Sequence, residues 1–286
     1  MKIGINVSTL EFDGYSRYGD EVYKRIKAHG YDCADVPMIS SRSPVYTEPE
    51  ELVIKRLLHE KALAEEAGIE ISQVHGPWRW PARDATEEDR AERLDKMKRS
   101  IRYTSILGCE NWVVHPIMPY GTNELDSPDA ERTWELNLLF MRELLQEAKR
   151  YDVTICLENM PMRGFSLAKP ADILRLVKEI NDPLFKICLD TGHVAAFNGA
   201  LDLTEEVLRL GSELRVLHVH DSRNGQDLHL MPGYGILDWK SFVDALRKIS
   251  YPGVFSLETT PSHKLSDGVF EDMSRLLCRI ARDILA

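Results

Sequence analysis

Six short apolar segments of the sequence are each followed at once by a side chain that can bind a metal ion. The segments are 71–74, 112–114, 153–157, 187–189, 216–217 and 254–257, and the residues that follow them are His75, His115, Glu158, Asp190, His218 and Glu258. One histidine in such a place is more often a structural hydrogen-bonding group than a ligand. A set spread over most of the chain needs a common cause, and parallel strands that all end on one face of a barrel supply it. We therefore expect a metal site at the mouth of a barrel.

The acidic members of this set carry most of the chemical argument. Glu158 and Glu258 each follow four or five apolar residues, where an unpaired buried carboxylate would cost several kcal/mol. A metal cation would compensate, and salt bridges to arginine are the alternative. Asp190 and His193 lie three residues apart in Leu-Asp-Thr-Gly-His, which we interpret as a tight turn permitted by Gly192. Mixed carboxylate and imidazole ligands suit manganese, cobalt, magnesium or zinc better than a soft thiolate metal.

The elements that must position these side chains alternate between strand and helix about eight times. We expect strands at 3–7, 31–36, 69–74, 111–114, from 153, 185–189, 214–218 and 254–257, and helices near 20–29, 50–67, 86–107, 130–150, 170–180, 203–210, 239–249 and 267–285. An open doubly wound sheet would carry a glycine-rich phosphate loop after the first strand, and residues 6–10 contain no glycine. We predict an α/β fold with a single (β/α)8 TIM-barrel domain over residues 1–286 and the metal site at the C-terminal strand ends.

Composition narrows the class of protein. The net charge of −10 disfavours a broad phosphate-binding surface. The five cysteines form no C-x-x-C pair, and Cys156 and Cys188 fall inside expected strands, so we expect buried thiols and no disulfide framework. The N-terminus lacks a signal-peptide apolar region, and no apolar run is long enough to span a bilayer, so we expect a cytoplasmic protein. His29 and His59 lie on expected helices, and we interpret both as solvated.

Five short motifs together carry a family resemblance. They are Leu-Glu-Asn at 157–159, Leu-Asp-Thr-Gly-His at 189–193, His-Val-His-Asp at 218–221, Asp-Leu-His-Leu with Pro-Gly-Tyr-Gly within 227–235, and Leu-Glu-Thr at 257–259. As a set they resemble the xylose isomerase-like TIM barrel superfamily, which includes sugar phosphate isomerase/epimerase-like proteins, ketose 3-epimerases, inosose-processing enzymes and endonuclease IV. The resemblance covers the expected strands from 69 to 257, and no single motif would suffice for it.

The resemblance implies a metal-dependent isomerase or epimerase of carbohydrate metabolism. The four ligands of the single metal in the sugar epimerases match Glu158, Asp190, His218 and Glu258. Manganese is expected first, with zinc, cobalt and magnesium as alternatives. His220 has the same strand parity as His218 and stays open as the ligand. We prefer His218 because the acidic residue of the motif then follows it at the family's spacing.

The same resemblance implies proton transfer beside a carbonyl through an enediolate, with the metal as Lewis acid. Glu158 and Glu258 would remove and return the proton. Substrate contacts are expected from His193, His75, His115, Arg223 and Trp78. Trp78 and Trp80 are placed to stack on a sugar face or to pack under the barrel rim. The chain departs from the ketose epimerases at Met162-Arg163-Gly164, where those enzymes carry a further glutamate.

Endonuclease IV is the main alternative. It holds three zinc ions, and its further ligands match His75, His115, His193, Asp227 and His229. Against it, the segment 11–15 is acidic and aromatic, whereas a DNA groove needs basic and intercalating loops. We expect a small carbohydrate as substrate and no nucleic-acid or membrane partner, and leave a homo-oligomer open. A lyase or dehydratase of the same superfamily is a further alternative, and a non-catalytic binding barrel is the least favoured.

Overall fold

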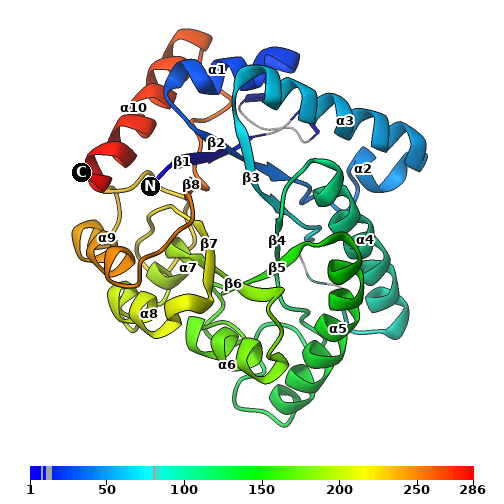
Figure 1. Ribbon diagram of the computed structural model, residues 1–286. Helices are drawn as coiled ribbons and strands as arrows, with labels where there is room; N and C mark the ends of the chain where they lie inside the picture. The colour runs from blue at the N-terminus through cyan, green and yellow to red at the C-terminus, as the bar shows by residue number, and fades with distance from the viewer. Residues whose placement is uncertain (8, 11–14, 80–81, 83) are drawn as a thin grey trace.

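A ring of eight parallel strands forms the centre of the computed structural model, which describes residues 1–7, 9–10, 15–79, 82 and 84–286 (Figure 1). The strands are β1 (Ile3–Asn6), β2 (Cys33–Pro37), β3 (Glu70–His75), β4 (Asn111–Val114), β5 (Thr154–Glu158), β6 (Phe185–Asp190), β7 (Leu214–His218) and β8 (Phe255–Leu257). They pair in the order β7-β6-β5-β4-β3-β2-β1-β8. A bridge between Val219 and Leu257 joins the two ends of this order. The predicted eight-stranded barrel is confirmed.

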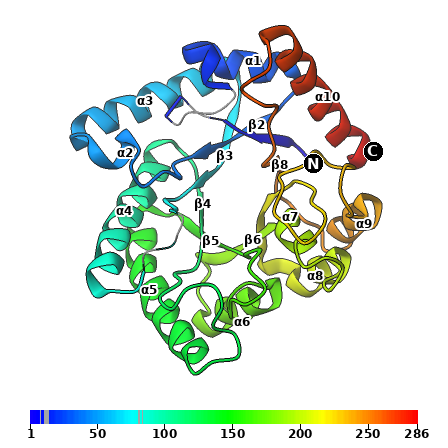
Figure 2. The same cartoon turned by 180° about the vertical axis from the view of Figure 1, so that it is seen from behind.

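Helices surround the ring on its outer side (Figures 1 and 2). They are α1 (Val22–His29), α2 (Pro44–Thr47), α3 (Glu50–Ala67), α4 (Glu87–Ile106), α5 (Asp129–Tyr151), α6 (Pro170–Ile180), α8 (Leu203–Leu210), α9 (Trp239–Lys248) and α10 (Asp267–Leu285), with 3-10 turns at Tyr15–Glu21 and Gly211–Glu213. The short helix α7 (Thr191–Ala195) follows β6 directly and lies close to the strands. Among the described residues, no helix is both long and apolar enough to cross a membrane. Helix α9 begins where the sequence indicated, because the Asp238 carboxylate accepts a hydrogen bond from the Ser241 N–H at 3.1 Å.

An apolar layer fills the interior of the barrel beneath the expected metal ligands. It consists of Val113, Cys156, Cys188 and Val216, all buried. Successive side chains of a strand point to opposite faces, so residues two positions later point into the same interior. Those residues are His115, Glu158, Asp190 and His218. The buried thiols are as predicted, and the same alternation that buries them aims four of the expected ligands at one point.

The segment Leu-Asp-Thr-Gly-His is not the tight turn that we expected. Strand β6 continues to Asp190, and α7 begins directly after it. The Asp190 carboxylate caps this helix by accepting a hydrogen bond from the His193 N–H at 2.6 Å. Gly192 is required for a different reason, since a Cβ at that position would lie 1.9 Å from Cε1 of His220. The glycine therefore allows close approach of α7 to His220, two residues beyond the end of β7.

The expectation that His29 is solvated is wrong. His29 is only 5% exposed and lies on α1, which packs beside α10 (Figures 1 and 2). Neither of its ring nitrogens has a hydrogen-bond partner among the described residues. Burial, together with the charge of Arg275, lowers the pKa of this imidazole. The folded protein therefore holds His29 neutral.

We predict that His29 makes the protein less stable in mildly acidic solution. Its pKa in the folded chain is below the value of about 6.5 in an unfolded chain, so protons bind preferentially to the unfolded state as the pH falls through that value. Between pH 7.5 and pH 5, the melting temperature of the wild type should fall further than that of His29→Leu, measured with chelator present. His59→Leu, at an exposed histidine, is the matched control and should follow the wild type. Parallel pH dependence of wild type and His29→Leu would contradict this assignment.

Candidate metal centre

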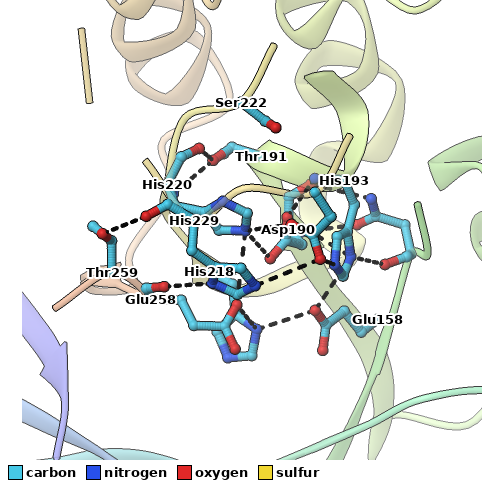
Figure 3. A network of polar contacts seen from close by, with 12 residues as sticks. Glu158, Asp190, Thr191, His193, His218, His220, Ser222, His229, Glu258 and Thr259 are labelled. Atoms are coloured by element: carbon cyan, nitrogen blue, oxygen red, sulfur yellow. Dashed lines mark hydrogen bonds and ion pairs between the residues drawn. The ribbon is translucent and has the colours of Figure 1, made fainter. Parts of the chain in front are cut away.

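The four residues expected to bind one metal converge at the C-terminal ends of β5 to β8 (Figure 3). One ligand atom from each of Glu158, Asp190, His218 and Glu258 lies within 4.8 Å of those of the other three. His218 lies close to both glutamates of this group. Its Nδ1 lies 3.2 Å from Oε1 of Glu158 and 3.4 Å from Oε2 of Glu258. The geometry is that of a compact set of oxygen and nitrogen donors.

The further residues that match the endonuclease ligands lie in the same cluster. Nε2 of His75 and of His115 lie 3.4 Å and 3.1 Å from Oε2 of Glu158. On the other side, Oδ2 of Asp227 lies 3.4 Å from Nε2 of His193 and 3.5 Å from Nε2 of His229. The structure therefore brings all nine expected residues together.

His220, the alternative to His218, lies beside the four-residue set. Its Nε2 is 2.9 Å from Oδ2 of Asp190 and 3.9 Å from Oε2 of Glu258. Its ring stacks on that of His229, with the ring centroids 4.1 Å apart. His220 belongs to two groups of three possible metal donors. One group is His220 with Asp190 and His193, and the other is His220 with His229 and Glu258, whereas His218 belongs to the group of four. This arrangement favours His218 as the ligand of the four-residue set.

These residues fit a divalent cation. In the described part of the chain, Glu158 and Glu258 form ion pairs with histidines and with no lysine or arginine. The alternative of arginine salt bridges is thus not found there. Buried carboxylates that lack a fixed cationic partner are unfavourable, and a metal ion would compensate them. The donor set of carboxylate oxygens and imidazole nitrogens is the one that manganese, zinc, cobalt and magnesium share.

The electrostatics of the cluster attract positive charge. Burial alone would lower the pKa of His193, but Asp190, Asp227 and Glu158 outweigh it and raise the pKa to about 10. Burial would raise the pKa of Glu158, but His218 and His115 hold it well below its usual range. Burial lowers the pKa of His115 to about 4, so its ring stays neutral with a lone pair free for a ligand bond.

Asn159 holds two residues of the cluster, Asp190 and His193, in place. Its side-chain oxygen accepts a hydrogen bond from the Asp190 N–H at 2.8 Å, and its side-chain amide donates to the Asp190 carbonyl at 3.1 Å. Its own carbonyl oxygen lies 2.6 Å from Nδ1 of His193. The Leu-Glu-Asn motif thus combines an expected ligand with the residue that orients the neighbouring strand.

Asp221 organises the loop after β7, which carries Asp227 and His229. Its carboxylate accepts hydrogen bonds from the backbone N–H of Ser222 at 2.9 Å and of Gly233 at 3.0 Å. It also accepts one from the Trp239 indole N–H at 3.0 Å. A carboxylate with several donors is well satisfied in the interior. The acidic residue of the His-Val-His-Asp motif is therefore a structural anchor for the loop.

Sequence reasoning missed Asp35 and Gln73. Asp35 is a fully buried residue of β2, and its Oδ2 lies 3.1 Å from Nε2 of His218. The Gln73 side-chain amide donates to the same oxygen at 2.9 Å. A signal was present, since Asp35 is an acidic residue between Ala34 and Val36 in the middle of an expected strand. It was missed because Asp35 does not stand at a strand end.

A cavity of about 290 Å³ opens above the cluster. Besides cluster residues, its lining includes an apolar wall made by Ile39, Trp78, Met160, Pro161 and Met162. Its lining contains the expected substrate contacts His75, His115, His193 and Trp78. A larger cavity of about 490 Å³, around Arg215 and Tyr251, lies at the opposite end of the barrel and contains none of the expected ligands.

Two arginines near the mouth do not face this cavity. Arg223 is exposed and is not among the described residues that line it. Arg163 donates from its guanidinium to the Ala196 carbonyl at 2.8 Å. Trp80 and the acidic segment 11–14 lie outside the described residues. The substrate contact expected from Arg223 stays a prediction, because this side chain is not part of the described lining.

Comparisons with known proteins agree with this architecture. The chain is 28% identical to a D-psicose 3-epimerase of Enterocloster bolteae over 270 residues, which covers 90% of this chain and 82% of the relative. It is 25% identical to a probable endonuclease 4 of Acholeplasma laidlawii over 265 residues, covering 84% and 86%. Among solved structures, the 3-keto-D-glucoside 4-epimerase of E. coli superposes with a TM-score of 0.74 at 20% identity over 98% of this chain and 99% of that one, which shows a shared fold. The profile of the xylose isomerase-like TIM barrel family matches residues 23–277, and the chain belongs to that family.

Proposed function

We propose that the protein is a divalent-metal-dependent isomerase or epimerase of a sugar, a sugar phosphate or an inositol-type derivative. The observation that carries the proposal is the convergence of Glu158, Asp190, His218 and Glu258 at the base of a cavity with an apolar wall. The oxygens of a polyhydroxylated substrate would contact the polar cluster residues, and its C–H groups would pack against the apolar side chains that line the cavity. The similarity to a sugar epimerase over most of both chains supports the same class.

In the proposed reaction, Glu158 and Glu258 move a proton beside a substrate carbonyl. Both line the cavity, and both lie within 3.4 Å of His218 Nδ1, so one small substrate can contact both. Glu158, Asp190, His218 and Glu258 would hold the metal, which supplies Lewis-acid stabilisation of negative charge on substrate oxygens. His193 also lines the cavity and would contact a substrate oxygen.

The wall of the cavity bears on the choice of substrate. The segment Met162-Arg163-Gly164 lies in the region where the ketose epimerases carry a further glutamate, and Met162 lines the cavity as an apolar side chain. Arg163, the next residue, is turned toward the Ala196 carbonyl. A substrate hydroxyl on that side would have neither a carboxylate nor this guanidinium as partner. This argues for a substrate other than the free ketoses of the 3-epimerases.

We predict that the protein exchanges a carbon-bound substrate proton with solvent. Ketoses, inososes and sugar phosphates should be incubated in D₂O with enzyme and Mn²⁺ and followed by NMR. At least one should gain deuterium at the carbon beside its carbonyl, because proton removal by a carboxylate precedes its return. Enzyme stripped with chelator is the control and should give no exchange. Absence of exchange across the whole panel would count against the isomerase class and favour a phosphodiesterase or lyase.

Replacing either glutamate should abolish the function while the fold remains. In Glu158→Gln and Glu258→Gln we expect a loss of bound metal in elemental analysis, or a fall in turnover of about 10²-fold or more, because each variant loses a ligand charge and a proton carrier. Glu206→Gln, which changes a buried glutamate on the outer helix α8, is the matched control and should keep both properties. Circular dichroism checks the fold. Full metal and full activity in both site variants would refute the proposed centre.

An endonuclease IV-like phosphodiesterase is the second candidate. The observation that favours it is the gathering of His75, His115, His193, Asp227 and His229 around the four central residues, which offers donors for more than one ion. The relative named as a probable endonuclease 4 supports it as well. The net charge of −10 speaks against it, because duplex DNA carries one negative charge per about 1.7 Å of helix axis.

We predict about one metal ion per chain and no cleavage of DNA. The protein, purified without chelator, should be analysed for metals and then incubated with zinc and a duplex that contains an abasic site. The substrate strand should stay intact on a denaturing gel, because the acidic chain must first overcome repulsion from the phosphates. Two or three zinc ions per chain, with cutting that His115→Ala abolishes, would reverse the order of the two candidates.

A further inference from the structure

We propose that Asp35 is a positioning residue of the metal centre, which fixes the His218 ring with Nδ1 toward the other ligands. This inference rests on the proposed metal-dependent function. Asp35 lies in the middle of β2, one layer below the strand ends, and its side chain is fully buried. It contacts no substrate cavity, so its effect would pass through His218.

The contact between Asp35 and His218 crosses the interior of the barrel. Strands β2 and β7 are not neighbours, because β1 and β8 lie between them in the ring. A register shift between Ala34 and Asp35 pairs Asp35 with Gln73 on β3. Gln73 donates to Asp35 at 2.9 Å and to the Leu217 carbonyl at 3.2 Å, directly before His218. The three side chains therefore tie β2, β3 and β7 together below the ligands.

His218 is oriented differently from the other imidazoles of the cluster. His75, His193 and His229 each have Nδ1 within 2.8 Å of a backbone carbonyl oxygen, so each directs Nε2 toward a neighbouring carboxylate. His218 is reversed, with Nδ1 toward Glu158 and Glu258 and Nε2 at 3.1 Å from Asp35. No described carbonyl holds its Nδ1, and a carboxylate faces its far nitrogen instead.

This reversal has a chemical consequence for metal binding. A neutral imidazole carries one N–H and one lone pair, and an acceptor at one nitrogen keeps the proton there. In the structure Nδ1 of His218 is hydrogen-bonded to Oε1 of Glu158 at 3.2 Å, whereas the 3.1 Å contact of Nε2 with Asp35 is an ion pair without hydrogen-bond geometry. An ion held at Nδ1 would displace the proton from that nitrogen, and the negative charge of Asp35 would then favour the proton on Nε2. Carboxylates behind metal-binding histidines orient the ring and make it a stronger donor, and their loss typically weakens metal affinity about 10- to 100-fold.

The fold alone does not account for Asp35. Its Oδ1 is buried with no hydrogen-bond partner among the described residues, and no lysine or arginine there pairs with the carboxylate. A buried carboxylate with one unsatisfied oxygen is unfavourable for the folded state. A residue kept only for stability would be apolar at this place in a barrel interior. A role of Asp35 in orienting His218 explains why a carboxylate is kept at this buried position.

Cobalt titration of the metal-free protein tests the proposal. We expect Asp35→Asn to weaken Co²⁺ affinity by about 10- to 100-fold and to alter the visible absorption bands of the bound ion. The melting temperature of the metal-free chain should stay equal or rise, since a strained buried charge is removed. Gln73→Met leaves Asp35 in place but removes the amide that orients it, and should weaken affinity in the same direction by a smaller factor. Glu206→Gln is the matched control.

The outcomes separate this inference from the proposed function. If the wild type binds no Co²⁺, the proposed metal centre fails. If the wild type binds Co²⁺ and Asp35→Asn has the same affinity and spectrum, the positioning role is overturned while the centre stands. Should Asp35→Asn not fold, unchanged Co²⁺ binding by Gln73→Met overturns it. An equal loss in Glu206→Gln would reduce the effect to a general loss of stability and would also overturn it.

Discussion

The accumulation of acidic side chains at one end of a closed ring of strands is the constraint on which the rest of this structure depends. Parallel strands end on the same face, and the period of two along each strand directs every second side chain into the interior. Glu158, Asp190 and His218, at the ends of their strands, point into the interior. The residues two positions before them, Cys156, Cys188 and Val216, point into it as well and form the apolar layer below. The described partners of Glu158 and Glu258 in ion pairs are histidines, and no described lysine or arginine pairs with either glutamate.

The surroundings of the cluster follow from the need to hold these charges still. Asn159 bonds both backbone groups of Asp190, and Asp221 gathers the loop that brings Asp227 and His229 over the site. Polar groups that are fully bonded in a low-dielectric interior are rigid, and a rigid arrangement is what a metal site requires. The helices outside the ring cover the strands and connect the end of each strand to the start of the next.

Much of the fold was predictable because it rests on local periodicity. The helices at 50–67, 170–180, 203–210 and 267–285 match their expected bounds, and every expected strand exists. The strand-end rule also named six residues, and the family resemblance added His193, Asp227 and His229; all nine lie together. What failed were contacts between distant segments. Burial of His29 depends on α10, and the closeness of Gly192 to His220 depends on how α7 lies against β7. Asp35 was missed because it lies in the middle of β2 and not at a strand end, and its contact with His218 across the barrel cannot be inferred from local sequence.

The place where β7 and β8 close the ring of strands lies within the proposed metal site. Strands β7 and β8 are joined through Val219, which accepts a hydrogen bond from the Glu258 N–H at 3.0 Å and donates one to the Ser256 carbonyl at 2.8 Å. Two proposed ligands, His218 and Glu258, thus flank the closure of the barrel on its two sides. An ion bound by both residues would link β7 to β8, which pair through a single bridge in the described residues. Separation of β7 from β8 would then require release of the ion. Amide hydrogen exchange at Val219 and Glu258 should therefore slow when the metal is bound.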